Sequence, residues 1–335
     1  MLLKHLKLAE LHVHLGSAVD PAILWNMTHD QGLKLPTKDY WEFVQMITAT
    51  KKKTKNLQDY LAILHQWTEV IQSSPYAVER SIYEIIGGAY RKNNITLLEI
   101  RFNPMKRNRG GEKDLDHIIM AALRGMDKAL LEYPQVKCGL IFCLDRGFPF
   151  EKNCVLAKKA MKYKNRGVVG LDFANFQHPG FKFSDYKEQV KEWRRTGLKI
   201  TVHTGETKET NDMEEAIKVL HPERIGHGIK AAYDKNIMQL IKKFDIVLEI
   251  CPTSNLLTKT VKDLKELKFI LQTFKRERVK FCLNTDGPEV FQTNLLKEIE
   301  LLLTNKILDE RDILKANMTA FLSTFIPKEA KNGYF

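Results

Sequence analysis

Two histidines lie two residues apart in an apolar run close to the start of the chain. The segment LAELHVHLGS covers residues 8–17 and carries His12 and His14. Alternate side chains of a β-strand point to the same face, so these two imidazoles would lie side by side. Imidazole nitrogens that face one space are typical ligands of a transition metal. The pair therefore directs attention to further ligands along the chain.

A third histidine and a carboxylate complete a potential metal site. His203 lies in TVHTGE and Asp286 in NTDGP, each at the end of a later apolar run. With the first pair they make three neutral imidazoles and one carboxylate, a set that leaves room for water on zinc. Bound zinc lowers the pKa of that water to near neutrality. The same set accepts iron, cobalt or manganese, so the metal's identity stays open at this point.

Two further groups have acid/base chemistry. Glu206 follows His203 by three residues and could donate a proton to a substrate, whereas His227 in RIGHG could accept one from water or orient the water. Each residue taken alone is more often a hydrogen-bonded core histidine, a helix-cap neighbour or a turn former. Since all of them fall at the ends of apolar runs, we expect a metal site, in which Asp286 is also catalytic.

Eight apolar runs could place these groups at one edge of a sheet, and amphipathic helical segments, for example 115–132, 184–196 and 263–276, separate most of them. Most runs are apolar on both faces, which is typical of buried parallel strands. The runs are 8–15, 96–104, 137–145, 168–175, 199–206, 224–228, 245–255 and 279–288. This alternation predicts an α/β fold, a (β/α)8 TIM barrel with its active site at the carboxyl ends of the strands. An open doubly wound sheet would show a Gly-rich phosphate loop after its first strand, and HLGSAVDP is not one.

We expect one domain over residues 1–335. Residues 20–92 are too long for one crossover and read as a helical cap inserted between the first two strands. Residues 292–326 read as closing helices. A chain of 335 residues is long enough for one such barrel.

Composition restricts the class of protein and its partners. The chain is 44% hydrophobic and 28% charged, no apolar stretch is long enough to span a bilayer, and the start does not resemble a signal peptide. Five cysteines without CxxC spacing indicate reduced core residues in a cytoplasmic protein. The net charge of +12 could attract an anionic substrate, but no nucleic-acid-binding motif accompanies it. We expect a small-molecule substrate, no membrane and no nucleic-acid partner, and leave the oligomeric state open.

Some polar segments receive no role at this stage. The basic stretch MKRN at residues 105–108 could contact a phosphate, but we interpret it as a solvated loop. Six further histidines fall in expected loops or helices and are assigned no function: His5, His29, His65, His117, His178 and His221.

The motifs together resemble those of the adenosine/AMP deaminase family of metal-dependent hydrolases. ELHVHLGS is similar to that family's HxH segment, TVHTGE to its H-[AT]-G-E motif, RIGHG to its GHG strand, ICPTSN to its CPxSN loop, and NTDGP to its TDDP ending. Their order and spacing agree over essentially the whole chain. The resemblance implies one zinc ion per chain, held by His12, His14, His203 and Asp286.

The resemblance also implies a reaction. Hydroxide would attack carbon 6 of a 6-aminopurine, Glu206 would protonate ring N1, and His227 would stabilise and deprotonate the water while ammonia leaves. The substrate would be a purine nucleoside or nucleotide, either adenosine or a 5′-modified or phosphorylated derivative. The zinc motif of cytidine deaminases is absent from the sequence.

Three recognition positions depart from the family pattern. The family commonly has an Asp after HxHL that meets the sugar's 5′-hydroxyl, and here that carboxylate is absent. Gly287 replaces the second Asp of TDDP, which usually bonds purine N7, and Asn175 replaces a Gly that faces purine N3. We count Asn175, Gly287, Ser17, Asp172 and Arg101 as candidate substrate contacts.

Other functions remain in competition. Gly287 could make space for a non-purine amino heterocycle, which the chain would then deaminate. A hydrolase that opens a cyclic amide often carries a bridging lysine after its fourth strand, and VVGLDFAN has none. A nucleoside-binding protein of the same fold without turnover would not need Glu206.

Overall fold

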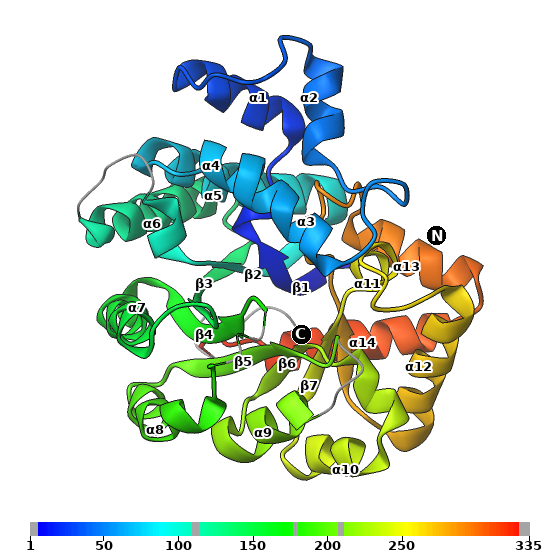
Figure 1. Ribbon diagram of the computed structural model, residues 1–335. Helices are drawn as coiled ribbons and strands as arrows, with labels where there is room; N and C mark the ends of the chain where they lie inside the picture. Colours follow the sequence, from blue (N-terminus) through cyan, green and yellow to red (C-terminus); the bar gives the residue numbers. More distant parts are fainter. Residues whose placement is uncertain (1–5, 109–113, 177, 179, 207–210, 328–335) are drawn as a thin grey trace.

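The computed structural model describes residues 6–108, 114–176, 178, 180–206 and 211–327. Eight parallel strands pair in the order of the sequence, each with the next, and helices surround them (Figure 1). The strands are β1 (Leu8–His14), β2 (Ile95–Phe102), β3 (Lys137–Asp145), β4 (Val168–Ala174), β5 (Lys199–Thr204), β6 (Arg224–His227), β7 (Val247–Ile250) and β8 (Phe281–Leu283). Their side chains are buried on both faces, as in a covered parallel sheet. The fold is the expected (β/α)8 TIM barrel.

Backbone contacts between the first strand and the segment after the last nearly close the barrel. Val13 forms an isolated parallel bridge with Asp286. The His14 amide donates to the Asp286 carbonyl at 2.9 Å, and the Asp286 amide donates to the His12 carbonyl at 2.9 Å. Three residues that the sequence marks as ligands therefore meet at this junction.

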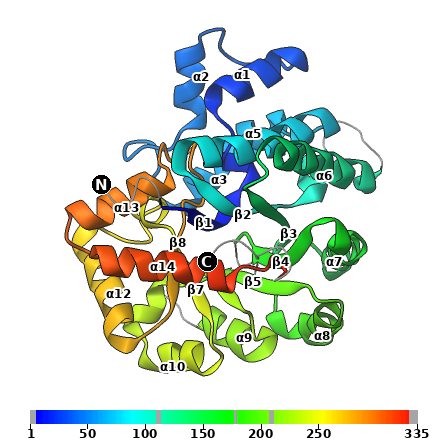
Figure 2. The ribbon, with the colours of Figure 1, turned by 180° about the vertical axis from the view of Figure 1, so that it is seen from behind.

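The helices are short to medium in length and most alternate with the strands. They are α1 (Pro21–Asp30), α2 (Tyr40–Ile47), α3 (Leu57–Ile63), α4 (Glu69–Ile71), α5 (Pro75–Asn93), α6 (Leu115–Glu132), α7 (Phe150–Tyr163), α8 (Lys187–Arg195), α9 (Asn211–Leu220), α10 (Lys235–Lys243), α11 (Pro252–Leu257), α12 (Leu264–Glu277), α13 (Leu295–Thr304) and α14 (Glu310–Ser323). Figure 2 shows α14 in front of the strands, and it packs against β1 and β8. No helix in the described ranges has the length and apolarity needed to cross a membrane.

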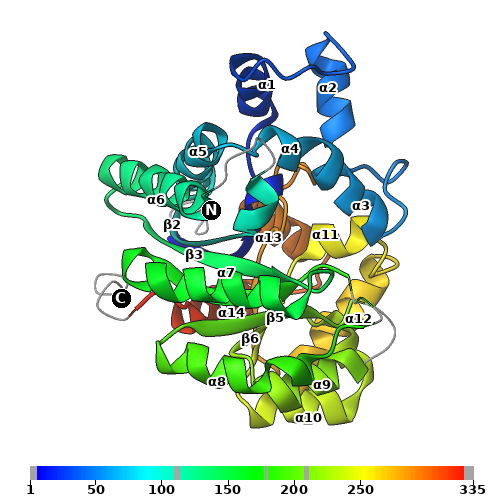
Figure 3. The same ribbon diagram turned by 60° about the vertical axis from the view of Figure 1, so that its left-hand side comes forward.

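The segment between β1 and β2 forms α1 to α5, with a π-helical stretch, η3, at Leu64–Thr68 between α3 and α4. In Figure 3, α1 and α2 stand apart from the barrel, whereas α3 and α4 lie over it. Single turns of π-helix occur frequently at functional sites. We refer to residues 15–94 as the insertion.

A ladder of buried ion pairs runs through the barrel interior. The Arg224 guanidinium bonds Glu99 and, at 2.6 Å, Glu249, while Arg101 bonds Glu249 at 2.8 Å and Asp172 at 2.9 Å. All five side chains are fully buried. Since an unpaired buried charge is costly, each of these groups is paired with at least one group of opposite sign on another strand.

Two expected strands prove too long. The run at 245–255 is β7 only over Val247–Ile250, because Pro252 begins α11. Proline has a fixed φ that suits the first turn of a helix. Asn255 therefore lies on a helix and not at a strand end, and the run at 279–288 is a strand only at Phe281–Leu283.

The expectation of a solvated loop at residues 105–108 is wrong. Pro104–Arg107 form a 3-10 helix, η4, that follows β2. The Arg107 side chain is 2% exposed and Lys106 is 18% exposed. This basic stretch therefore faces the interior, where it can contact a ligand.

Candidate metal and active site

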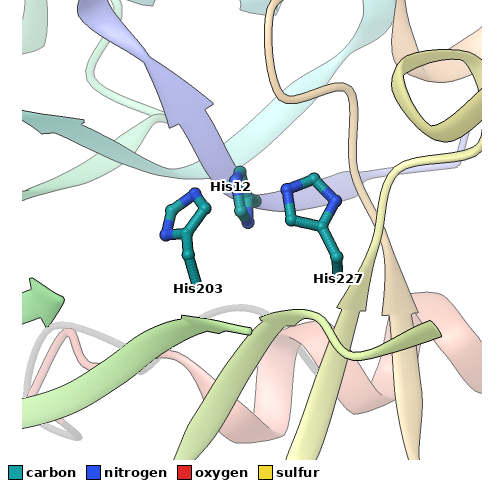
Figure 4. A group of neighbouring side chains, drawn as sticks. All are labelled: His12, His203 and His227. Carbon is teal, nitrogen blue, oxygen red and sulfur yellow. The ribbon is translucent and has the colours of Figure 1, made fainter. Parts of the chain in front are cut away.

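Three imidazoles converge at the carboxyl ends of the strands. His12, His203 and His227 come from β1, β5 and β6 and point toward one another (Figure 4). The ring centroid of His12 lies 4.6 Å from that of His203 and 4.9 Å from that of His227. Since the strands are parallel, residues distant in sequence reach the same edge of the barrel.

His14 and Asp286 join this group. Nε2 of His14 lies 3.1 Å from Nε2 of His203 and 3.5 Å from Oδ1 of Asp286. Asp286 Oδ1 is also 3.8 Å from His12 Nε2, while Asp286 Oδ2 accepts a hydrogen bond from Ser254 Oγ at 2.6 Å. The structure thus brings together all four ligands that the sequence suggests.

Carboxylates behind two imidazoles fix which nitrogen faces the site. Nδ1 of His12 donates to Glu249 at 2.7 Å, and Nδ1 of His203 donates to Asp172 at 3.0 Å. In a neutral imidazole the other nitrogen, Nε2, then presents a lone pair. Carboxylate–histidine contacts of this kind orient imidazole ligands on metals.

The protonation of these groups also suits a cation. Burial lowers the pKa values of His12 and His14 well below the usual value, and burial lowers the pKa of His227 to about 4. These rings are therefore neutral, as metal binding requires. Nε2 of His12 is buried and has no hydrogen-bond partner among the described residues. A buried nitrogen without a partner is costly, and a bound metal would satisfy it.

Two overlapping sets of ligand atoms lie close enough to share an ion. One set is His12, His14 and Asp286, and the other is His12, His203 and His227, with ligand atoms within 4.8 Å of one another in each. Imidazole with carboxylate is the donor chemistry that Zn²⁺ prefers. The residues present fit a zinc ion.

Glu206 and His227 face each other beside this cluster. Oε1 of Glu206 lies 3.7 Å from Nε2 of His227, and burial raises the pKa of Glu206. Asn255 Nδ2 donates to His227 Nδ1 at 3.1 Å. That contact leaves the ring proton of His227 on Nε2, so this histidine can donate a hydrogen bond toward Glu206 and the cavity.

A cavity, called here the main cavity, lies directly against the cluster. The insertion contributes apolar side chains and the barrel contributes polar ones. Its lining is His14, Leu57, Tyr60, Leu61, Leu64, Arg146, Ala174, Asn175, Phe176, His203, Thr204, Gly205, Glu206, Asp212, His227 and Asp286. An apolar pocket with a few convergent polar groups is typical of a small-molecule site.

Arg146 connects the end of β5 to the first turn of α9. Its guanidinium donates to the His203 carbonyl and, at 3.2 Å, to Asp212 Oδ2, which also accepts from Thr204 Oγ1 at 2.7 Å. The sequence places Arg146 at the end of a strand but offers no sign of these partners. Arg146 is buried, and its two bonds hold β5 and α9 together.

The candidate substrate contacts divide into two groups. Asn175 lines the main cavity, and its Nδ2 donates to Asp145 at 2.9 Å. Arg101 and Asp172 are fully buried in the ion-pair ladder, and Ser17, which is 1% exposed, accepts from the Tyr60 hydroxyl at 3.2 Å. Ser17, Asp172 and Arg101 are not part of the main-cavity lining.

Gly287 does not open space beside the site, contrary to the expectation for a non-purine ring. A Cβ at this position would lie 2.7 Å from Ser17 Oγ and 2.8 Å from the Tyr60 hydroxyl oxygen. The space that a side chain of residue 287 would need is therefore filled by Ser17 and Tyr60. Gly287 is needed here because the two neighbours pack against its backbone.

Sequence reasoning missed Glu249, which contacts His12 and both arginines of the ion-pair ladder. The available signal was a single carboxylate inside the apolar strand VLEI, since a buried charge needs partners. The lining residues of α3 gave no comparable signal, because their role depends on tertiary contacts.

Comparison with known families agrees over nearly the whole chain. A family profile described as adenosine deaminase matches residues 7–334. An adenosine deaminase of Clostridium kluyveri is 31% identical over 339 residues, which cover 100% of this chain and 94% of the relative. An adenosine deaminase of Vibrio atlanticus is 30% identical over 324 residues, which cover 96% of this chain and 94% of the relative.

Solved structures share the fold at lower sequence identity. Arabidopsis ADAL complexed with IMP has a TM-score of 0.83 at 21% identity, over 99% of this chain and 96% of that chain. Adenine deaminase from Arthrobacter aurescens has a TM-score of 0.80 at 20% identity, over 98% of this chain and 96% of that chain. An amidohydrolase from Burkholderia ambifaria with bound zinc has a TM-score of 0.83 at 18% identity, over 98% of this chain and 88% of that chain.

Proposed function

The chain belongs to the adenosine deaminase family, and from this premise we propose that it catalyses hydrolytic deamination of a 6-aminopurine nucleoside. The substrate is adenosine or a 5′-modified or phosphorylated derivative, and the products are the 6-oxopurine and ammonia. Structural neighbours support a purine substrate, because one is described as an N6-methyl-AMP deaminase and another as a complex with IMP.

We assign the metal site to His12, His14, His203 and Asp286. A zinc ion bound there would act as a Lewis acid and would lower the pKa of its bound water to near neutrality. The neighbour with bound zinc supports this choice of metal. Glu249 and Asp172 hold His12 and His203 with their Nε2 lone pairs toward the site.

The remaining groups move protons. Glu206, whose pKa is raised by burial, donates a proton to purine N1 as the water oxygen adds to carbon 6. His227 donates a hydrogen bond from Nε2 and orients the attacking water, because Asn255 occupies its Nδ1. The amino nitrogen takes one proton of the attacking water and leaves as ammonia, the water's other proton restores Glu206, and the water oxygen remains on carbon 6. We further propose that the insertion caps the site through Leu61 and Leu64 of α3 and η3.

One observation carries this proposal: a protonatable glutamate and a neutral histidine face each other in a cavity that adjoins a cluster of imidazole and carboxylate ligands. A binding protein would gain nothing from Glu206 kept ready to donate a proton.

The test is release of ammonia by the zinc-loaded full chain. Adenosine, AMP, methylthioadenosine, adenine and aminodeoxyfutalosine would be supplied separately, with the metal content measured in the same samples. We expect turnover of at least one 9-substituted 6-aminopurine. Absence of ammonia from every substrate, with zinc bound, would contradict the proposed function.

A further inference from the structure

A second cavity, called here the side cavity, opens beside the main one. The two share His14, Leu61, Leu64, Ala174 and Asn175. The side cavity lies against the ends of β2 and β3 and the insertion, whereas Glu206 and His227 follow from β5 and β6. A substrate with its reacting ring at the cluster would therefore extend its far end into the side cavity.

The cations that line the side cavity are already paired with carboxylates. Lys106 Nζ lies 2.6 Å from Asp145 Oδ2, and Arg107 Nη2 donates to Glu69 Oε1 at 3.2 Å. Arg101, which also lines this cavity, is bonded to two carboxylates of the ion-pair ladder. The cavity therefore does not present a surplus of positive charge to an anion.

Glu69 offers a hydrogen-bond acceptor to a ligand in the side cavity. This residue begins α4, and its side chain is 12% exposed. Its Oε2 is buried and has no hydrogen-bond partner in the described part of the chain, and His65 Nε2 lies 3.7 Å from it. A buried carboxylate oxygen without a donor is costly, and a hydroxyl is a donor that fits such an acceptor.

The loop after His14 leaves room for this arrangement. A Cβ on Gly16 would lie 3.0 Å from Arg107 Nη2 and 3.3 Å from Glu69 Cγ. The ion pair of Glu69 and Arg107 therefore occupies the space that a side chain at residue 16 would need. A carboxylate from the insertion stands next to the strand that carries the histidine pair.

We propose that Glu69 is a specificity-determining residue that accepts a hydrogen bond from the 5′-hydroxyl of the substrate's sugar. This inference rests on the proposed function and narrows its substrate class to nucleosides with a free 5′-hydroxyl. The 5′-hydroxyl is the sugar group furthest from the purine ring, so it reaches furthest into the side cavity. Arg107 holds the Glu69 carboxylate in place.

A 5′-phosphate is disfavoured by the same geometry. Phosphate oxygens only accept hydrogen bonds at neutral pH, and they would approach Glu69 and Asp145. Lys106 and Arg107 already contact carboxylates, which reduces the positive charge that they present to an added anion. Recognition of phosphate by these two cations is the alternative that the experiment must exclude.

The experiment compares adenosine, 5′-deoxyadenosine and AMP with the zinc-loaded protein. In the native chain we expect kcat/KM for adenosine to exceed that for 5′-deoxyadenosine and for AMP by about tenfold or more, as for a hydrogen bond to a charged group. In Glu69→Gln the adenosine preference over 5′-deoxyadenosine falls to within about threefold, because an amide NH₂ replaces the acceptor. The matched control is Glu192→Gln on the exposed face of α8, which should keep the native ratios.

Three outcomes would overturn the inference. A native preference for AMP over adenosine would assign the side cavity to a phosphate. Equal loss of adenosine and 5′-deoxyadenosine turnover in Glu69→Gln would show a merely structural role. Native turnover of both nucleosides in that variant would remove Glu69 from substrate recognition.

A binding measurement separates this inference from the proposed function. Dissociation constants of adenosine and 5′-deoxyadenosine are measured by calorimetry with zinc-loaded Glu206→Gln, with and without Glu69→Gln. If native protein produces no ammonia but adenosine still binds more tightly through Glu69, the proposed function fails and the inference stands. If Glu69→Gln leaves the ratio of the two constants unchanged, or neither nucleoside binds, the inference fails.

Discussion

At the scale of single residues, the contacts behind each imidazole decide the chemistry in front of it. Glu249 and Asp172 accept from the Nδ1 atoms of two histidines, whereas Asn255 donates to the Nδ1 of His227. The first two rings therefore present lone pairs, and the third presents an N–H. One donor or acceptor behind the ring distinguishes a ligand from a group that orients water.

Asp286 tests the metal assignment. Asp286→Asn should lower zinc affinity by more than the roughly 10-fold to 100-fold that loss of an outer partner costs, because it removes the only carboxylate of the proposed set. Zinc per chain is measured by mass spectrometry after dialysis against a buffered metal pool.

A control is available for the backbone conformation of Asp286. Asp245 has φ 55° and Asp286 has φ 66°, a left-handed region that Asn tolerates. The Asp245 side chain is 76% exposed, so Asp245→Asn should bind zinc normally. Native zinc content in Asp286→Asn would remove this residue from the ligand set.

Glu206 tests the assignment of the proton donor. Glu206→Gln keeps the shape but removes the transferable proton, so we expect kcat to fall by about 100-fold to 10,000-fold while zinc content stays native. Steady-state ammonia release is measured beside Glu192→Gln, an exposed change of the same kind. A native rate in Glu206→Gln would contradict the proposed role.

At the scale of elements, Glu298 connects α13 to the start of α11. Its carboxylate accepts from the Thr253 amide at 3.0 Å and from Thr293 Oγ1 at 2.6 Å. Burial raises the pKa of Glu298 from 4.5 to about 7. The protonated form is therefore favoured in the folded chain, and it contributes stability that is complete below about pH 4.5 and lost as pH rises through 7.

Glu298→Gln should consequently change the pH dependence of stability. The interval between 4.5 and about 7 corresponds to at most about 3 kcal/mol. From pH 5 to about pH 8, the unfolding free energy of the variant should rise relative to native by an amount approaching that limit. Urea unfolding at each pH gives the difference. A difference that does not vary with pH would contradict the account.

Some of these elements could be predicted from the sequence, and others could not. Strands such as Lys137–Asp145 were predictable because apolar residues fill both faces, and α6 was predictable over its full length from its helical period. The predicted strand at 245–255 was too long, because apolar side chains continue past β7 into α11, where Pro252 starts a helix. Periodicity does not distinguish a short buried strand from a short buried helix.

The candidate site shows a similar division. The histidines and Asp286 were predictable from their motifs, because polar groups at the ends of apolar runs need partners. Glu69 and His65 were not, since they lie on the insertion and reach the site only through the packing of α3, η3 and α4 over the barrel. Gly287 was misjudged because its neighbours, Ser17 and Tyr60, come from distant segments.

At the scale of the whole molecule, the proposed metal connects distant parts of the chain. Its ligands come from β1, β5 and the segment after β8, and that segment also nearly closes the barrel through its bridge to Val13. A ligand that binds only the folded chain stabilises it by mass action. Binding of the proposed metal would therefore stabilise this junction between the two ends of the barrel.

Zinc should accordingly raise the thermal stability of the full chain. At a free concentration a thousandfold above Kd, the expected gain is about 4 kcal/mol, which is a rise of several degrees in Tm for a chain of this size. Calorimetric scans with zinc and after chelation measure it, and Asp286→Asn should lose most of the shift. An equal Tm in both states would contradict a metal held by these strands.

The most direct test of the central claim is to follow the water oxygen. The zinc-loaded protein is incubated with adenosine in water enriched in oxygen-18, and both ammonia and the nucleoside product are quantified, the latter by mass spectrometry. The account predicts one ammonia per product molecule and one oxygen-18 atom at carbon 6 of the product. Product without the label, or no product while zinc is bound and adenosine is taken up, would contradict hydrolytic deamination at this site.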